Sequence, residues 1–319
     1  MESLKILITG VSGFIGSNVA GQLVNANHEI YGVSRSKHYN WRLEELEGQI
    51  RLITSDICSY ENLREAIKSI KPDGIIHCAQ YGAYPQEKIN KEMFYTNVAG
   101  LFNILEICSD LNINWLINCG TSFEYGGSED KISEEVKSNP VSYYGIFKSA
   151  STNMLSLYSR VLRTKLLTLR IFQAYGPFEP KGRLAAYLLF NLLSNSTVYL
   201  NNPNIERDFI YVKDVSAMFE KSIKIIDNVE GHEIINAGRG IPVSIQDFAR
   251  TGKEVLGSSS KIILGNLAEK PEDKTARLVA DISKARRILK WSPKYDVKNG
   301  IRDYAVWMNA KLNFYIEQS

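Results

Sequence analysis

The sequence predicts a doubly wound α/β fold with a parallel sheet, followed by a smaller mixed α/β domain. Three observations predict this fold. Short apolar runs alternate with helical patterns over the first two-thirds of the chain, a glycine-rich turn follows the first run, and the alternation ends after about residue 175. Apolar runs of this length suit strands that are buried on both faces of a parallel sheet. Ligands of such sheets bind at the carboxyl ends of the strands.

The apolar runs define the expected strands. They cover Lys5–Thr9, Glu29–Ser34, Arg51–Thr54, Gly74–His77, Trp115–Asn118 and Leu166–Arg170. Helical patterns lie between the runs, and the clearest of them cover Glu61–Ser69, Met93–Leu111 and Tyr143–Arg163. Repeated strand–helix units of this kind build a sheet that carries helices on both faces.

The pattern changes after Tyr175, where Gly176-Pro177 and Glu179-Pro180 interrupt the alternation. The later elements are short and mixed, and turn residues join them. We therefore expect residues 1–175 to form the first domain. Residues 176–319 should form mainly the second domain, with a segment at about 207–240 returning to the first.

Composition excludes several classes of function. The 319 residues carry 38 basic against 35 acidic side chains, and a net charge of +3 does not indicate a nucleic-acid partner. No apolar run approaches the roughly 20 residues that cross a bilayer, so no membrane insertion is expected. Four cysteines without C-x-x-C spacing and four isolated histidines indicate no disulfide framework and no metal site. A strand near the first residue leaves no room for a signal peptide, so we expect a cytoplasmic protein.

The turn after the first strand has the context of a dinucleotide-binding fingerprint, which predicts a Rossmann-type domain. Its glycines are spaced G-x-x-G-x-x-G and open a helix. Glycines allow the tight turn and the close approach of a pyrophosphate, and the helix N-terminus favours the phosphates. A plain strand–helix turn is the alternative. The expected cofactor contacts here are Gly10, Gly13, Phe14, Ile15 and Gly16.

The end of the second strand should meet the adenosine ribose of the cofactor. NAD usually meets an acidic residue there, whereas the 2′-phosphate of NADP requires cations. This chain has Ser34-Arg35-Ser36-Lys37-His38 and no carboxylate. A guanidinium binds phosphate well, so Ser34 and Arg35 favour NADP(H) over NAD(H). The alternative is a solvated basic loop.

Tyr144 and Lys148 stand four residues apart in an expected helix, so they share one face. A phenol with a pKa of about 10 is a poor acid at neutral pH, and a neighbouring ammonium favours its ionised form. This spacing also arises by chance. The glycine turn and Thr121, a hydroxyl residue at the end of an expected strand, make a functional role for the pair more probable than chance.

Motifs along nearly the whole chain resemble extended short-chain dehydrogenases/reductases of the NAD-dependent epimerase/dehydratase family, which act on nucleotide sugars. The motifs are G-V-S-G-F-I-G from Gly10, N-V-A-G-L-F-N-I-L-E from Asn97, C-G-T-S-F-E-Y-G, P-V-S-Y-Y-G-I-F-K, R-I-F-Q-A-Y-G-P, E-R-D-F-I-Y-V-K-D and A-D-I-S-K-A-R-R-I-L-K-W. The resemblance implies a catalytic group of Thr121, Tyr144 and Lys148. Tyr144 would supply a proton, Thr121 would bond the carbonyl oxygen, and Lys148 would also hold the nicotinamide ribose.

The resemblance also implies further cofactor and substrate contacts. Asp56 and Ile57 would meet the adenine, Ala79 would line the nicotinamide pocket, and Asn97 would belong to the cofactor site. Arg207 and Arg277 would bind the diphosphate of a nucleotide sugar, since planar cations suit that group. The remaining substrate candidates are Gln173, Tyr81, Tyr84, Ser122 and, in the loop entering the second domain, Lys181 and Arg183.

The residues after Thr121 bear on the reaction. Related 4,6-dehydratases carry Asp-Glu at this place, but this chain carries Ser122-Phe123, so dehydration is not expected. We expect NADPH-dependent reduction of an NDP-4-keto-6-deoxyhexose. The nearest resemblance is to 4-ketoreductases such as CDP-abequose and CDP-paratose synthases, in deoxysugar biosynthesis for lipopolysaccharide O-antigen. The alternatives are a nucleotide-sugar epimerase and a non-catalytic NADP(H)-binding regulator. Relatives pair two long helices across a twofold axis, which implies a homodimer through a four-helix bundle.

Overall fold

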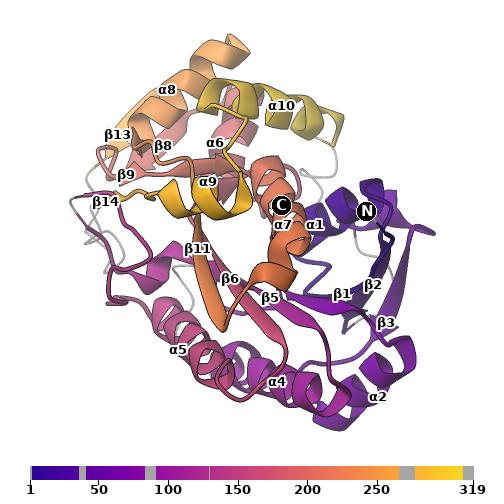
Figure 1. Ribbon diagram of the computed structural model, residues 1–319. Coiled ribbons are helices and arrows are strands. Elements are labelled where there is room, and N and C mark those ends of the chain that lie inside the picture. Colours follow the sequence, from indigo (N-terminus) through magenta and orange to yellow (C-terminus); the bar gives the residue numbers. More distant parts are fainter. Residues whose placement is uncertain (1, 36–40, 83–90, 129, 266–276, 312–319) are drawn as a thin grey trace.

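The fold is built around one central β-sheet. The computed structural model describes residues 2–35, 41–82, 91–128, 130–265 and 277–311. Within these ranges seven parallel strands form one sheet in the order β11-β6-β5-β4-β1-β2-β3 (Figure 1). They are β1 Lys5–Thr9, β2 Glu29–Ser34, β3 Ile50–Thr54, β4 Gly74–His77, β5 Trp115–Thr121, β6 Lys165–Ile171 and β11 His232–Ala237. The strand order reverses between β1 and β4, which is where a doubly wound sheet opens a crevice for ligands.

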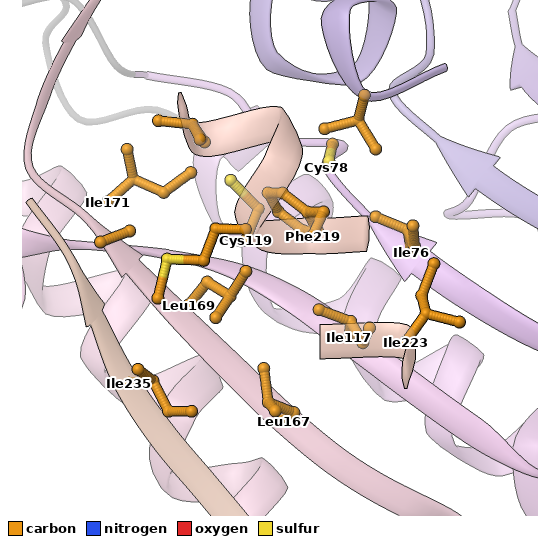
Figure 2. Packing of buried hydrophobic residues seen from close by; sticks show 14 of the residues in the cluster. Ile76, Cys78, Ile117, Cys119, Leu167, Leu169, Ile171, Phe219, Ile223 and Ile235 are labelled. Carbon is orange, nitrogen blue, oxygen red and sulfur yellow. The ribbon is translucent and has the colours of Figure 1, made fainter. Parts of the chain in front are cut away.

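Helices cover both faces of this sheet, so the predicted doubly wound α/β fold is confirmed (Figure 1). On one face lie α2 Tyr60–Ile70, α4 Gly100–Leu111 and α5 Tyr143–Tyr158. On the other face lie α1 Phe14–Asn25, α7 Val212–Ile225 and α9 Ser283–Leu289. Figure 2 shows Phe219 and Ile223 of α7 packed on apolar strand residues such as Ile117 and Leu167. Burial on both faces explains why the strands read as continuous apolar runs.

Two expected helices differ from the observed ones. The pattern Met93–Leu111 contains a short helix α3, Lys91–Phe94, a π-helical segment, Tyr95–Ala99, and only then α4. Ser151 Oγ donates to the Asn97 carbonyl oxygen at 2.6 Å, which gives that carbonyl a partner outside its own helix. Helix α5 ends at Tyr158 instead of Arg163 because the chain must turn before it enters β6.

The remaining elements build a smaller lobe with its own apolar core. Its helices are α6 Leu184–Leu193, α8 Ile245–Leu256 and α10 Val297–Ala310. Its strands are β7 Gln173–Tyr175, β8 Val198–Asn201, β9 Glu206–Arg207, β10 Phe209–Tyr211, β12 Val243–Ser244, β13 Ile262–Gly265 and β14 Arg277–Leu278. Phe209 and Phe248 stack there with ring centroids 4.1 Å apart. The domain boundary at residue 175 stays a prediction. Every helix of the described ranges is too short or too polar to span a bilayer.

Candidate active site

A cavity of about 460 Å³ lies at the carboxyl ends of the central strands, a size typical of ligand pockets. It brings together many of the residues that the sequence singled out. Those that line it are Gly10, Gly13, Phe14, Ile15, Gly16, Ser34, Arg35, Asp56, Ile57, Ala79, Tyr81, Thr121, Tyr144 and Gln173. Their roles as cofactor and substrate contacts stay predictions, but their convergence defines the candidate site.

The glycine turn forms one wall of the cavity. Gly10 has a φ of +67°, and a Cβ there would lie 2.5 Å from the backbone nitrogen of Ala79. At Gly16 a Cβ would lie 2.2 Å from the carbonyl oxygen of Gly10. Side chains at either position are therefore excluded. Helix α1 begins here without a capping side chain, so its first N–H groups remain available for an anion. This cradle fits the pyrophosphate of a dinucleotide.

Side chains of both charges line the part of the cavity at the end of β2. Ser34 and Arg35 at the end of β2 line it together with Asp56, whose Oδ1 accepts a hydrogen bond from the Cys58 N–H at 2.9 Å. Arg42 also lines the cavity, and its Nε donates to the Phe178 carbonyl oxygen at 2.8 Å. Sequence reasoning missed Arg42, although it closes the same basic segment that suggested a phosphate contact.

The expected catalytic group comes from two adjacent elements. Thr121 ends β5 and Tyr144 lies in the first turn of α5, where Ser142 Oγ accepts a hydrogen bond from the Gly145 N–H. Both Thr121 and Tyr144 line the cavity. Lys148 follows one turn later, is 3% exposed and does not line the cavity itself. The helix and the strand end thus present a phenol and a hydroxyl on the same side of the cavity.

The protonation of Tyr144 differs from the sequence expectation. Burial raises the pKa of the Tyr144 phenol above its ordinary value, and the nearby Cys119 thiol raises it further. Arg183 and a hydrogen bond with the Thr121 side chain lower that pKa only in part. The expected lowering of the pKa by Lys148 is therefore wrong for the protein alone, since desolvation outweighs the cations around the phenol.

His77, at the end of β4, is 2% exposed and does not line the cavity. Burial, and next the positive charge of Lys148, lower the pKa of His77 to about 3, so its imidazole is neutral at physiological pH. Its Nδ1 lies 2.8 Å from Thr9 Oγ1, a contact between two strand ends. The described residues also contain no group of three His, Cys, Asp or Glu side chains that could hold a metal ion.

Gln80 is a site residue that sequence reasoning missed. It follows β4, lines the cavity and accepts a hydrogen bond from the Tyr144 hydroxyl at 2.6 Å between the two oxygens. No spacing rule connects an amide in this loop with a helix 64 residues later. The only signal available was a polar residue three positions after the expected strand end, in H-C-A-Q.

Several predicted residues lie outside the cavity lining. Asn97 instead holds the backbone of Tyr81, with its side chain 2.9 Å from the Tyr81 N–H nitrogen and 2.7 Å from the Tyr81 oxygen. Ser122 is buried in a 3₁₀ turn behind Thr121. Lys181 places its ammonium 4.6 Å from the ring centroid of Phe190. Tyr84 lies outside the described residues.

The two arginines expected at the diphosphate are neighbours in a small sheet, away from the cavity lining. Arg207 lies in β9 and Arg277 in β14, and these strands pair in parallel. Arg277 Nε lies 3.1 Å from Glu206 Oε2, so this side chain forms an ion pair. Arg183, in contrast, lines the cavity and also forms an ion pair with Glu179, at 3.3 Å.

The sequence is similar to a known protein family and to several curated proteins. Residues 6–238 match the family model described as NAD dependent epimerase/dehydratase family. A protein named UDP-glucuronate 4-epimerase from Thermodesulfobacterium geofontis is 26% identical over 318 residues, with 96% of each chain covered. UDP-glucuronate 4-epimerase 4 of Arabidopsis thaliana is 24% identical, with 98% of this chain and 76% of the relative covered.

Solved structures share the fold over nearly the whole chain. UDP-glucose 4-epimerase of Thermotoga maritima, solved with UDP-glucose, has a TM-score of 0.87 and 21% identity, covering 97% of this chain and 100% of that one. A variant of UDP-glucuronic acid 4-epimerase from Bacillus cereus, in complex with a fluorinated UDP-glucuronic acid and NAD, also has a TM-score of 0.87. It is 23% identical and covers 96% of this chain and 99% of that one.

Proposed function

Because the chain belongs to the NAD dependent epimerase/dehydratase family, we propose that it is a nucleotide-sugar 4-epimerase that keeps its dinucleotide cofactor bound throughout turnover. One observation carries this proposal above the others. The Tyr144 hydroxyl and the Thr121 side chain share one cavity with the glycine turn, so a proton-transfer group and a dinucleotide cradle belong to one site. The substrate class that we propose is a UDP-hexose or UDP-hexuronate, as the names of the relatives suggest.

The 4-ketoreductase expected from the sequence is wrong. The similar curated proteins and solved structures described above are named UDP-glucuronate or UDP-glucose 4-epimerases. The sequence argument relied on Ser122-Phe123, which excludes dehydration, and on Arg35, which concerns the cofactor. Neither feature separates reduction from epimerisation, because both reactions move a hydride and a proton at the same sugar carbon.

The chain's own residues can perform the proton transfers of a 4-epimerase. Tyr144 accepts the proton of the sugar 4-hydroxyl as the C4–H bond breaks, and Thr121 bonds the same oxygen. When bound, the oxidised dinucleotide supplies a reversible hydride acceptor. After the sugar has rotated so that the opposite face of C4 is presented, Tyr144 returns the proton to the oxygen on C4. Arg183, which lines the cavity, is the cation whose charge lowers the pKa of the Tyr144 phenol and so favours its ionised form.

The cofactor fits the residues of the cavity. Gly10 and Gly16 allow the turn to pack tightly against the backbone of Ala79 and against itself, where a Cβ would clash, and the start of α1 lines the cavity. Solved relatives that name a cofactor name NAD, and this favours NAD over the NADP(H) expected from Ser34 and Arg35. We therefore propose NAD, with Arg35 as the residue that would admit a 2′-phosphate.

We also propose a homodimer. Exposed apolar side chains follow α3, the π-helical segment, α4 and α5: Phe94, Tyr95, Phe102, Tyr143, Ile146 and Leu157, each 44–62% exposed. Such a group on neighbouring helices is typical of an interface. Two copies of α4 and α5 would then pack as a four-helix bundle.

Incubation of the purified protein with UDP-glucuronate or UDP-glucose tests the proposal without added cofactor. We expect the substrate to be converted to its 4-epimer, and NMR of the anomeric proton measures this conversion. Denaturation of the protein should release a stoichiometric amount of NAD. Oxidation of added NADPH by a 4-keto sugar nucleotide, with no epimer formed from either UDP-sugar, would refute it.

A further inference from the structure

A fully buried carboxylate stands directly behind the cavity wall. Glu124 is 0% exposed, lies three residues after Thr121 and does not line the cavity. Its Oε1 accepts a hydrogen bond from the Thr121 N–H at 3.0 Å. Thr121 Oγ1 in turn accepts from the Phe123 N–H at 3.4 Å, which leaves the hydroxyl proton of Thr121 free to donate elsewhere. The carboxylate thus fixes the backbone and, through the turn, the side chain of Thr121.

Arg170 neutralises this carboxylate from the neighbouring strand. Its Nε donates to Glu124 Oε2 at 2.9 Å, and its side chain is 6% exposed. The guanidinium also lies over the ring of Tyr125, 4.4 Å from the centroid. The Tyr125 hydroxyl donates to Asn236 Oδ1 at 2.8 Å, so the pair is anchored to β11 as well. A buried ion pair seldom adds net stability, because both charges must leave water.

The backbone carbonyl of Glu124 is also linked, through Ser138, to the helix that carries Tyr144 and Lys148. This carbonyl oxygen accepts from Ser138 Oγ at 2.6 Å. Ser138 Oγ lies 2.7 Å from Ser149 Oγ, and Ser149 directly follows Lys148 in α5. Because Ser138 gives its proton to Glu124, Ser149 must donate to Ser138. One residue therefore links the end of β5 with the middle of α5, the two elements that present the expected catalytic side chains.

We propose that Glu124 and Arg170 are positioning residues that set the distance between Thr121 and Tyr144, an inference that rests on the proposed function. Neither side chain lines the cavity, so the pair acts through the backbone of Thr121, while the Glu124 backbone is linked to α5 through Ser138. The charges are needed because a charged pair fixes direction more strictly than a neutral hydrogen bond does. The ion pair therefore aligns Thr121 with Tyr144 in addition to filling space in the core.

Kinetics of Glu124→Gln separate alignment from packing. Gln keeps the size of the side chain but turns an amide toward Arg170. We expect kcat for the UDP-sugar to fall at least tenfold, with KM and the amount of bound cofactor within twofold. The double variant Glu124→Gln, Arg170→Gln pairs two amides and should recover part of kcat. The control Lys284→Met removes an ion pair with Glu233 on the outer strand β11 and should leave kcat unchanged.

Hydrogen exchange gives a second measurement that needs no substrate. We expect the amide of Thr121 to exchange at least tenfold faster in Glu124→Gln than in the wild type. If Glu124→Gln does not fold, Ser138→Ala removes only the link to α5 and should lower kcat severalfold at unchanged melting temperature. Unchanged exchange, or an unchanged kcat in a folded variant, overturns the positioning role. Absence of epimerisation by the wild type would refute the proposed function alone.

Discussion

The Tyr144 hydroxyl donates a hydrogen bond to Gln80 Oε1, 2.6 Å away across the cavity. This bond joins the first turn of α5 to the loop after β4, and it occupies the proton that an epimerase must exchange with its substrate. A sugar hydroxyl that binds between Thr121 and Tyr144 has to replace the amide as the partner of the phenol. Gln80 therefore competes with the substrate for the phenol, which gives it a measurable effect on proton transfer.

Tyr144→Phe tests the proton transfer directly. We expect kcat to fall about 10²–10⁴-fold, the usual contribution of a positioned acid or base. Bound cofactor should stay within twofold, since the glycine cradle is untouched. The matched control is Tyr143→Phe, because Tyr143 is 53% exposed and precedes Tyr144 in the same helix. Equal kcat in the Tyr144→Phe variant and the wild type would remove Tyr144 from the mechanism.

Gln80→Glu should move the pH dependence of turnover. A carboxylate beside the phenol favours its protonated form and raises the pKa of Tyr144 further. The rising limb of kcat against pH should then shift to higher pH. Gln80→Met removes the hydrogen bond without adding charge and serves as the control. A pH profile of Gln80→Glu that matches the control contradicts the contact described above.

Arg35→Ala should change cofactor selectivity. We expect the Kd of NADP to rise at least tenfold and that of NAD to change less than threefold, because only NADP carries the 2′-phosphate. Titration of cofactor-stripped protein measures both constants. Arg51→Ala is the control, since Arg51 lies on the adjacent strand and pairs with Glu29 at 3.0 Å. Equal losses for NAD and NADP would refute the assignment of Arg35.

The partly buried His232 should make the fold sensitive to acid. Burial lowers the pKa of His232 to about 4, and its ring nitrogens lie 2.8 Å from Ser156 Oγ and Thr168 Oγ1. The unfolded chain has a histidine pKa of about 6.5 and binds this proton first, so the free energy of unfolding falls as the pH drops from 6.5 to 4. His232→Gln should flatten this dependence in urea titrations. An unchanged slope would show that His232 does not contribute.

Leu157→Asp tests the proposed dimer. Leu157 is 62% exposed on α5, and a buried carboxylate at an interface disfavours association. We expect sedimentation of a monomer, whereas the wild type sediments as a dimer. Val306→Asp, at a 70% exposed position of α10, should leave the dimer intact. A monomeric wild type would remove the interface altogether.

Six of the seven strands in the described parallel sheet were predicted, whereas β11, His232–Ala237, was not predicted as a strand. Expected and observed bounds coincide for β1, β2 and β4, because strands buried on both faces must be continuously apolar. The glycine turn was predictable for a similar reason, since backbone approaches of this kind admit only glycine. Thr121 and Tyr144 reached the same cavity because strand ends and helix starts meet at one edge of such a sheet.

The remaining features depend on pairings that no local pattern records. Glu124 meets Arg170 across 46 residues, and Tyr144 meets Gln80 across 64. In the π-helical segment the Asn97 carbonyl oxygen accepts a hydrogen bond from Ser151 Oγ on another helix. Arg277, predicted to bind a diphosphate, forms an ion pair with Glu206, because the parallel pairing of two short strands places them together. The type of reaction could not follow from residues that both reactions share.

The contact of Asn97 with both backbone groups of Tyr81 has an evolutionary consequence. One amide side chain ties the loop after β4 to the helical segment that precedes α4. A loop of different length would move Tyr81 out of register with that amide. Among relatives, we therefore expect the residue type at position 97 to covary with the length of this loop, so that sequences that lose the asparagine also remodel the loop.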